Sequence, residues 1–366
     1  MILTRRELLA AGGALAGAAM LPRWAFANAG FIAETSPWRN YEVITRLDLT
    51  GQKGRVQAWV PVPSVNEAEW FKSLGSEWKT NAASARIVRD PHYGAEMVHL
   101  EWKEGEAAPT AEIVSRISTR DRAQGTAGKA GPLFDADRKL YTMATDLIPT
   151  SGIVKETADK ITAGAETDAD KARAIYRWIV DNTFRDPKTR GCGNGDIAAM
   201  LKTGNLSGKC ADLNALLVGL ARAAGIPARD VYGIRVAPSK FGYKSLGAGS
   251  EVITKAQHCR AEVYLEGQGW VPADPADVRK VILEEPPKNL AMDDPKVVTA
   301  RNTLFGAWEG NWLAYNMGHD IALPGSQGGA KVAFLMYPQA ETAAGLLDCL
   351  EADSFKYTIT SREVQA

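Results

Sequence analysis

Apolar and polar residues alternate with a period of two through the first third of the chain. Two alternating runs between residues 41 and 62 are separated by a turn at 51–54, and shorter runs follow at 98–102 and 113–117. Alternation at this period is typical of strands with one buried face, and several short strands separated by turns indicate a β-sandwich. We therefore predict a sandwich-like all-β domain over residues 31–135.

The periodicity changes to that of helices beyond a stretch of small residues at 125–131, which we predict to be a linker. Thr167 followed by Asp170 resembles a capping box, and apolar residues then recur at i, i+3, i+4 and i+7. Another helix is predicted to begin at Cys210, to carry a row of leucines, and to end at Gly225. This part of the chain is therefore expected to be rich in helices.

Strands return after the second helix. The pattern predicts them at 231–236, 258–265 and 270–274, the last two joined by a glycine-rich turn. Helices combined with antiparallel strands indicate an α+β fold, and we place this core at residues 150–285. The pattern weakens over residues 286–366, which we expect to form a C-terminal extension that completes the same domain.

The composition excludes one large class of partner. Of the 366 residues, 45% are hydrophobic and 23% are charged, as in ordinary soluble globular proteins, and the length allows two domains. The 43 basic and 43 acidic residues cancel, and no arginine cluster or basic stripe marks a phosphate-binding surface. A nucleic-acid partner is therefore not expected.

Residues 1–27 have the pattern of a twin-arginine signal peptide. Arg5 and Arg6 precede an apolar run that is interrupted by glycines and is shorter than the about 20 residues that a transmembrane helix needs. The segment Ala25-Phe26-Ala27 has the small-x-small form of a cleavage site. We expect a mature protein that begins near Asn28, is periplasmic or secreted, and keeps no transmembrane anchor. An uncleaved N-terminal anchor is the alternative.

Four cysteines are too few to make this chain a disulfide scaffold, so their reactivity is the more informative property. They are Cys192, Cys210, Cys259 and Cys349. The sequence alone does not determine whether Cys192 and Cys349 form a disulfide. Cys210 lies where a helix is predicted to begin, and the unpaired backbone N–H groups there favour a thiolate and can stabilise an oxyanion. The alternative is a buried cysteine that packs as a small hydrophobic residue.

His258 is the candidate base. In a strand that begins at this residue, His258 and Arg260 share the polar face, whereas Cys259 begins an apolar face that should contact the core. His258 therefore points to the side on which a base is needed, and Cys259 points away from it. His319 is the alternative base, within an aromatic and polar stretch at 308–320 that could line a substrate cleft or pack on the core.

Two aspartates can orient the imidazole ring. Asp274 ends the strand that follows His258 across a turn, and a carboxylate on that neighbouring strand can accept the second ring N–H. Asp277 competes for this role because the strand register is not determined by the sequence. We favour Asp274, since the turn between the strands places it closer.

Three motifs and a histidine follow one another in a fixed order along the chain. They are Gly208-Lys209-Cys210-Ala211-Asp212, Gly225-Ile226-Pro227-Ala228-Arg229, His258 and Gly269-Trp270-Val271-Pro272-Ala273-Asp274. Together they resemble the core of the transglutaminase-like superfamily over residues 150–280. The resemblance implies a papain-like fold in which a cysteine-bearing helix packs on an antiparallel sheet. By this matching, Cys210 is the nucleophile, His258 the base and acid, and Asp274 the residue that orients it.

The resemblance also implies roles for residues around this trio. Arg229 matches a position that we interpret as structural, pairing with a carboxylate, and Asp212 is interpreted as an acid of the first helical turn. The family usually adds an upstream side chain to the oxyanion site, for which Asn194 and Trp178 are the candidates.

The chemistry shared by this family is attack of a thiolate on an amide or acyl carbonyl, giving a thioester that water or an amine resolves. We predict hydrolysis of a peptide or protein substrate, hence a cysteine peptidase or amidase, because an exported enzyme meets water in excess. Aminolysis would instead make the protein a protein-glutamine acyl transferase, a crosslinker. A third hypothesis is a non-catalytic binding protein with a vestigial cysteine site.

Zinc is the metal that these residue types suggest. Thiolate, imidazole and carboxylate ligands from Cys210, His258, Asp274 and Cys192 would suit it. The sequence has neither C-x-x-C nor H-x-x-x-H spacing, and the trio already has a metal-free explanation. We therefore predict no metal and no cofactor.

Overall fold

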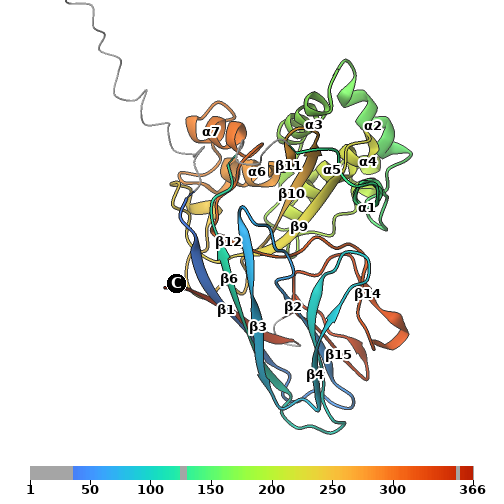
Figure 1. Cartoon of the computed structure of the whole chain (residues 1–366), viewed down its shortest axis with the longest axis vertical. Helices are drawn as coiled ribbons and strands as arrows, with labels where there is room; N and C mark the ends of the chain where they lie inside the picture. Colours follow the sequence, from blue (N-terminus) through green and yellow to red (C-terminus); the bar gives the residue numbers. More distant parts are fainter. Residues whose placement is uncertain (1–35, 124–129, 352–354, 366) are drawn as a thin grey trace, which may run out of the picture.

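The computed structural model describes residues 36–123, 130–351 and 355–365. The predicted signal peptide at 1–27 lies outside these ranges, as does most of the predicted linker at 125–131. Figure 1 shows the helices gathered at one end of the molecule and long antiparallel strands at the other, so the predicted α+β class is confirmed. No helix in these ranges combines the length and the apolar character that a membrane span requires.

The β-rich end is a sandwich of two antiparallel sheets. One has the strand order β17-β1-β6-β3 and the other the order β16-β15-β2-β5-β4. Leu47 and Ile113 of the first sheet share a hydrophobic cluster with Val60 and Leu100 of the second, so the alternating residues meet in one core. The strands from the first third of the chain are β1 (Arg39–Asp48), β2 (Gln57–Val62), β3 (Phe71–Thr80), β4 (Ser84–Arg89), β5 (Glu96–Glu101) and β6 (Thr110–Thr119).

The helix-rich end is built around one central helix. α5 (Cys210–Ala223) is buried along its whole length and packs between α2 and α3 on one side and the sheet β11-β10-β9-β12 on the other. Thr167 caps α3 as predicted, its hydroxyl accepting the backbone N–H of Asp170 at 3.1 Å. The surrounding elements are α1 (Asp135–Thr142), α2 (Ile153–Thr162), α3 (Asp168–Asn182), α4 (Ile197–Thr203), α6 (Pro275–Glu284), α7 (Pro295–Thr303), β9 (Ala228–Arg235), β10 (Gln257–Leu265), β11 (Gly269–Ala273) and β12 (Trp312–Asn316).

The C-terminal residues 286–366 are divided between the two ends of the molecule. α7 and β12 join the helix-rich end, where β12 pairs with β9. β15 (Gln339–Thr342) instead pairs with β2, and β17 (Lys356–Val364) pairs with β1. Only the first part of this segment therefore lies where the sequence pattern placed it, because the later strands cover edges of the sandwich that would otherwise be open. The shorter elements are β7 (Phe184–Arg185), β8 (Ser207–Gly208), η2 (Lys244–Leu246), β13 (Ile321–Ala322), η3 (Gln327–Gly329), β14 (Lys331–Val332) and β16 (Gly345–Leu346).

A glycine in the middle of the central sheet makes room for a tryptophan. Gly233 in β9 pairs with His258 of β10 on one side and with Ala314 of β12 on the other. A Cβ atom at Gly233 would overlap the Leu313 carbonyl and the ring of Trp312. The indole N–H of Trp312 donates to the carbonyl of His258 at 3.0 Å. This hydrogen bond helps to hold the start of β10 in place.

A buried charge network links the sandwich to the central sheet. Glu262 in β10 is fully buried and accepts hydrogen bonds from Arg122, which follows β6, and from Arg229 in β9, the latter at 2.5 Å. Arg229 also donates to Glu67 at 2.9 Å and lies over the ring of Trp270 at 3.9 Å. The position of Arg229 is therefore the carboxylate-paired, structural one that the resemblance implied.

Replacing Glu262 with alanine should lower the free energy of unfolding by about 3–5 kcal/mol, because two buried guanidinium groups lose their carboxylate. Glu67→Ala is the matched control, since this side chain pairs with the same Arg229 but is 37% exposed. Its loss should cost no more than about 1 kcal/mol. Urea unfolding followed by circular dichroism measures both variants, and equal losses would contradict a dominant role for Glu262.

Candidate active site

The start of α5 is held by the carboxylate of Asp212. Its Oδ2 accepts the backbone N–H of Lys209 at 2.9 Å, and its Oδ1 accepts the backbone N–H groups of Asn194 and Gly195, each at 3.0 Å. A carboxylate in the first turn satisfies N–H groups that have no partner within the helix. Asp212 thus occupies the helix-start position expected of it, and it fixes the backbone around Cys210.

Glycines allow a loop to close over this helix start. A Cβ atom at Gly193, whose φ is +94°, or at Gly208 would overlap the Asp212 carboxylate. The carbonyl of Cys192 accepts the backbone N–H of Ala211 at 2.9 Å, its thiol donates to the carbonyl of Gln257 at 3.4 Å, and its side chain shares a buried cluster with Cys210. The loop therefore brings a second thiol against the first, a neighbour that the sequence pattern did not indicate.

His258, the second residue of β10, lies beside the thiol of Cys210. Its side chain is buried, its Nε2 is 2.7 Å from Oδ2 of Asp274, and it lines the same cleft as Cys210. Because Nε2 donates to the carboxylate, Nδ1 is the ring nitrogen left for the thiol. The structure thus brings together the three residues that the sequence singled out.

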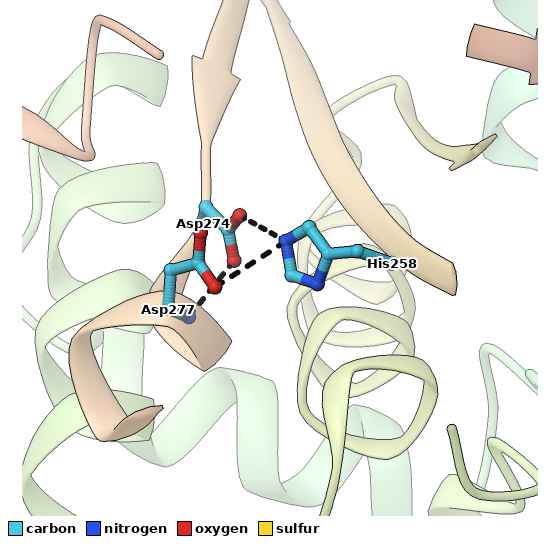
Figure 2. A group of neighbouring side chains, drawn as sticks. All are labelled: His258, Asp274 and Asp277. Carbon is cyan, nitrogen blue, oxygen red and sulfur yellow. Dashed lines mark hydrogen bonds and ion pairs between the residues drawn. The ribbon is translucent and has the colours of Figure 1, made fainter. Parts of the chain in front are cut away.

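Two carboxylates lie on the same side of the His258 ring, as Figure 2 shows. Asp274 is the N-cap of α6 and accepts the backbone N–H of Asp277 at 3.0 Å and the side-chain amide of Asn214 at 3.2 Å. Oδ1 of Asp277 is 3.4 Å from Nε2 of His258, but it is 2.6 Å from the guanidinium group of Arg235. Asp274 is therefore the nearer partner of His258, and Asp277 is the partner of Arg235.

These neighbours shift the pKa of each group in the cluster. Burial and the charge of Arg235 disfavour a protonated His258, but the carboxylates of Asp277 and Asp274 outweigh them and raise its pKa. Burial raises the pKa of Asp274, and repulsion from Asp277 adds to the effect. Burial also acts to raise the pKa of Asp277, but the guanidinium group of Arg235 outweighs this effect and holds the pKa of that carboxyl below its usual range. The cluster therefore favours the protonated form of His258.

The pKa of the Cys210 thiol is well below its usual value. The neighbouring side chains of Cys192 and Cys259 stabilise the thiolate and outweigh burial, which acts in the opposite direction, and His258 lowers the pKa further. Cys259 lies on the apolar face of β10, as predicted. Because α5 packs on that face, the thiol of Cys259 contacts Cys210, and the prediction that Cys259 points away from the site is wrong. All four cysteines are free thiols.

A cleft of about 590 Å³ opens beside Cys210 and His258. Its walls come from the start of α5, the segment around 247–258, Tyr337 and Tyr357. Because Tyr357 belongs to β17, the sandwich supplies one wall of the cleft. A cavity of this size is typical of sites that enclose a small molecule or a short peptide segment.

Three residues that the sequence suggested for this site lie elsewhere. The Nδ1 of His319 is 3.3 Å from the hydroxyl of Tyr232 and its Nε2 is 3.5 Å from Asp230, and burial lowers the pKa of His319 well below its usual value. Asn194 lines the same small cavity as His319, whereas Trp178 packs against the helical core. None of these three side chains lines the cleft described above.

The zinc hypothesis loses support from the way the potential ligands are grouped. Among the described residues, the group whose ligand atoms all lie within 4.8 Å of one another is His258, Asp274 and Asp277, without a cysteine. The guanidinium group of Arg235 is bound to Asp277, which places a positive charge where a cation would bind. The four-ligand set that includes Cys192 and Cys210 is not assembled.

Cys210 at a helix start, together with a histidine that donates to an aspartate, forms a candidate Cys–His–Asp site on a helix-and-sheet core. Residues 155–275, which contain all three residues, match the family model of the transglutaminase-like superfamily. A protein from Haemophilus influenzae is 36% identical over 342 residues, which cover 88% of this chain and 91% of the relative. The chain therefore belongs to the transglutaminase-like superfamily.

One further sequence relative and one solved structure are also similar to this chain. YebA of Bacillus subtilis is 29% identical over 232 residues, which cover 54% of this chain but only 31% of YebA. Both this relative and the Haemophilus protein are described as uncharacterized. The crystal structure of a candidate cysteine protease from Cytophaga hutchinsonii covers 90% of this chain and 99% of its own chain, with a TM-score of 0.53 and 16% identity. At this identity the similarity supports the fold alone.

Proposed function

We propose that this protein is an exported cysteine peptidase or amidase that cleaves a peptide or protein substrate through Cys210, His258 and Asp274. The observation that carries the proposal is the placement of Cys210, at the start of α5, and His258 on one cleft, with Nε2 of His258 2.7 Å from the buried carboxylate of Asp274. A histidine held in this way can accept the thiol proton and return it to a leaving group. Export rests on the twin-arginine pattern of residues 1–27.

The proposed reaction has two steps. In the first, the thiolate of Cys210 attacks the carbonyl carbon, a C–S bond forms, the C–N bond breaks, and protonated His258 gives its proton to the leaving amine. In the second, His258 takes a proton from water, the resulting hydroxide attacks the thioester, and the C–S bond breaks to release the acid. Asp274 accepts a hydrogen bond from the Nε2–H group throughout, which keeps Nδ1 directed at the sulfur and stabilises the imidazolium.

Two hydrogen-bond donors of residues that line the cleft are suited to the oxyanion that forms in both steps. The backbone N–H of Cys210 is at the first helical position and has no acceptor within α5. The side-chain amide nitrogen of Gln257, directly before His258, is buried without an acceptor among the described residues, and Gln257 also lines the cleft. We assign the side-chain donor to Gln257 in place of Asn194 or Trp178. The sequence offered no signal for it, because a glutamine before a histidine is not a distinctive motif.

Incubation with a library of peptide amides is expected to produce a thioester on Cys210 and free carboxylic acids. Rapid quenching followed by intact-protein mass spectrometry detects the acyl-enzyme, and mass spectrometry of the peptides identifies the products. An added primary amine should divert only a minor share of the acyl groups. Products dominated by the amine adduct would favour the protein-glutamine acyl transferase, and the absence of both acyl-enzyme and product would favour the vestigial binding protein.

A further inference from the structure

The cleft beside Cys210 carries a charge that the chain as a whole does not have. The chain has 43 basic and 43 acidic residues, yet the described residues that line the cleft include six cationic side chains and no aspartate or glutamate. Walls of low dielectric constant concentrate such a field on a bound ligand. The six cationic residues are Arg185, Arg190, Lys209, Arg235, Lys255 and Lys280.

Carboxylates behind the lining compensate part of this charge. Arg235 is paired with Asp277 at 2.6 Å. Arg185 and Lys280 share one carboxylate, that of Glu284, which is 3.9 Å from the ammonium group of Lys280. Three cations on this side of the cleft therefore face two carboxylates, so one positive charge is left in excess.

The charges of the other three cations in the lining are compensated even less by carboxylates. Arg190 pairs with Asp348 at 2.6 Å, but both side chains are about half exposed, and ion pairs of this kind contribute little. Lys209 and Lys255 have no carboxylate within ion-pair distance in the part of the chain that the structure describes. An incoming anion would therefore meet cations that have no strong competing partner.

A further carboxylate would stabilise the charged form of Lys280 more than that of the other cations in the cleft. Its side chain is only 19% exposed, and it has the longest of the ion pairs in the cleft wall. Burial and the neighbouring charge of Arg235 lower its pKa to about 8. A carboxylate bound beside this ammonium group would replace the water that burial has removed.

We propose that the cleft selects acidic peptides, with one carboxylate that flanks the scissile bond bound by Lys280 and further carboxylates bound by Lys209 and Lys255. The inference rests on the proposed function, because a thiol activated by histidine acts on acyl groups, and it adds the class of substrate. It also fits the position of the cations, which surround the same cavity that contains Cys210 and His258.

The test uses three peptide amides that share one scissile bond and carry glutamate, glutamine or lysine at the flanking positions. The glutamate peptide should have a kcat/KM at least about tenfold above that of the glutamine peptide, with the lysine peptide lowest, and added salt should reduce the difference. Lys280→Met should remove most of this preference through KM. Lys202→Met is the matched control, since Lys202 is an exposed lysine of α4 outside the cleft, and it should keep the preference.

Binding of the same peptides to the Cys210→Ala variant, measured by calorimetry, separates this inference from the proposed function. Tight binding of the acidic peptide, weakened by Lys280→Met, supports selection of acidic peptides by the cationic cleft, whether or not the wild-type protein turns the peptide over. Equal affinity for the glutamate and glutamine peptides, or a preference unchanged by Lys280→Met, would overturn it. Absence of turnover for all three peptides with charge-selective binding intact would instead count against the proposed function alone.

Discussion

Alanine at position 210 is expected to abolish turnover while the fold stays intact. Removing the nucleophile should lower kcat by about 10⁴-fold or more, since no thioester can form. Cys210 is buried, but alanine differs from cysteine by a single sulfur atom, so the free energy of unfolding should change by no more than about 1 kcal/mol. Peptide turnover and thermal unfolding, measured on the same preparation, check both statements.

Cys349→Ala is the matched control, because Cys349 lines the same cleft and burial raises the pKa of its thiol. This variant should keep its turnover. Iodoacetamide should alkylate Cys210 in the wild-type protein with an apparent pKa below the usual value of about 8.5, and this low-pH labelling should disappear in Cys210→Ala. An active Cys210→Ala variant, or a Cys210 thiol with an ordinary pKa, would contradict the proposed mechanism.

Loss of His258 is expected to have the second-largest effect. His258→Ala should lower kcat/KM by about 10²–10⁴-fold, because His258 is the one histidine among the described residues that line the cleft, and general acid–base catalysis contributes this much. His319→Gln should leave kcat/KM within about threefold of the wild type, since general acid–base catalysis requires hydrogen-bond reach and His319 lies outside the cleft. Steady-state kinetics on both variants, below their unfolding temperatures, decides between the two histidines. A larger loss in His319→Gln would reverse the assignment.

The dependence of activity on pH tests the roles of Cys210 and His258 independently. The lowered pKa of Cys210 and the raised pKa of His258 leave thiolate and imidazolium together over the range between them. Activity should therefore rise as the pH increases through the pKa of Cys210 and fall as the pH passes the pKa of His258. A profile that lacks the alkaline fall would argue against a protonated His258 as the general acid.

Local sequence patterns predicted the elements that carry the site. The start of the helix at Cys210 and the strand phase at His258 depend on neighbouring residues, and both are present in the structure. The order of the motifs along the chain identified the transglutaminase-like superfamily, which the comparisons confirm. These features follow from the periods of helices and strands, which residues close in sequence are sufficient to specify.

Contacts between distant segments could not be predicted in the same way. Asp274 lies nearer to His258 than Asp277 does because of the way α6 begins, beyond the last paired residues of β10 and β11. The alternation of side chains along a strand does not specify this geometry. The thiol of Cys259 was expected to point away from the site, but α5 packs on its face of the sheet. A pattern of period two assigns a side chain to a face, whereas the element that covers this face is decided by packing.

By itself, the sequence determined the kind of fold, its family and the residue types of a Cys–His–Asp site. The tertiary structure decided which carboxylate lies nearest His258, which thiols contact Cys210, and that the C-terminal strands return to the sandwich. It also decided the charge of the cleft, since six cations from separate segments of an electrically neutral chain converge there. Secondary structure depends on short-range periodicity, whereas a site depends on register and packing between segments that are far apart in the chain.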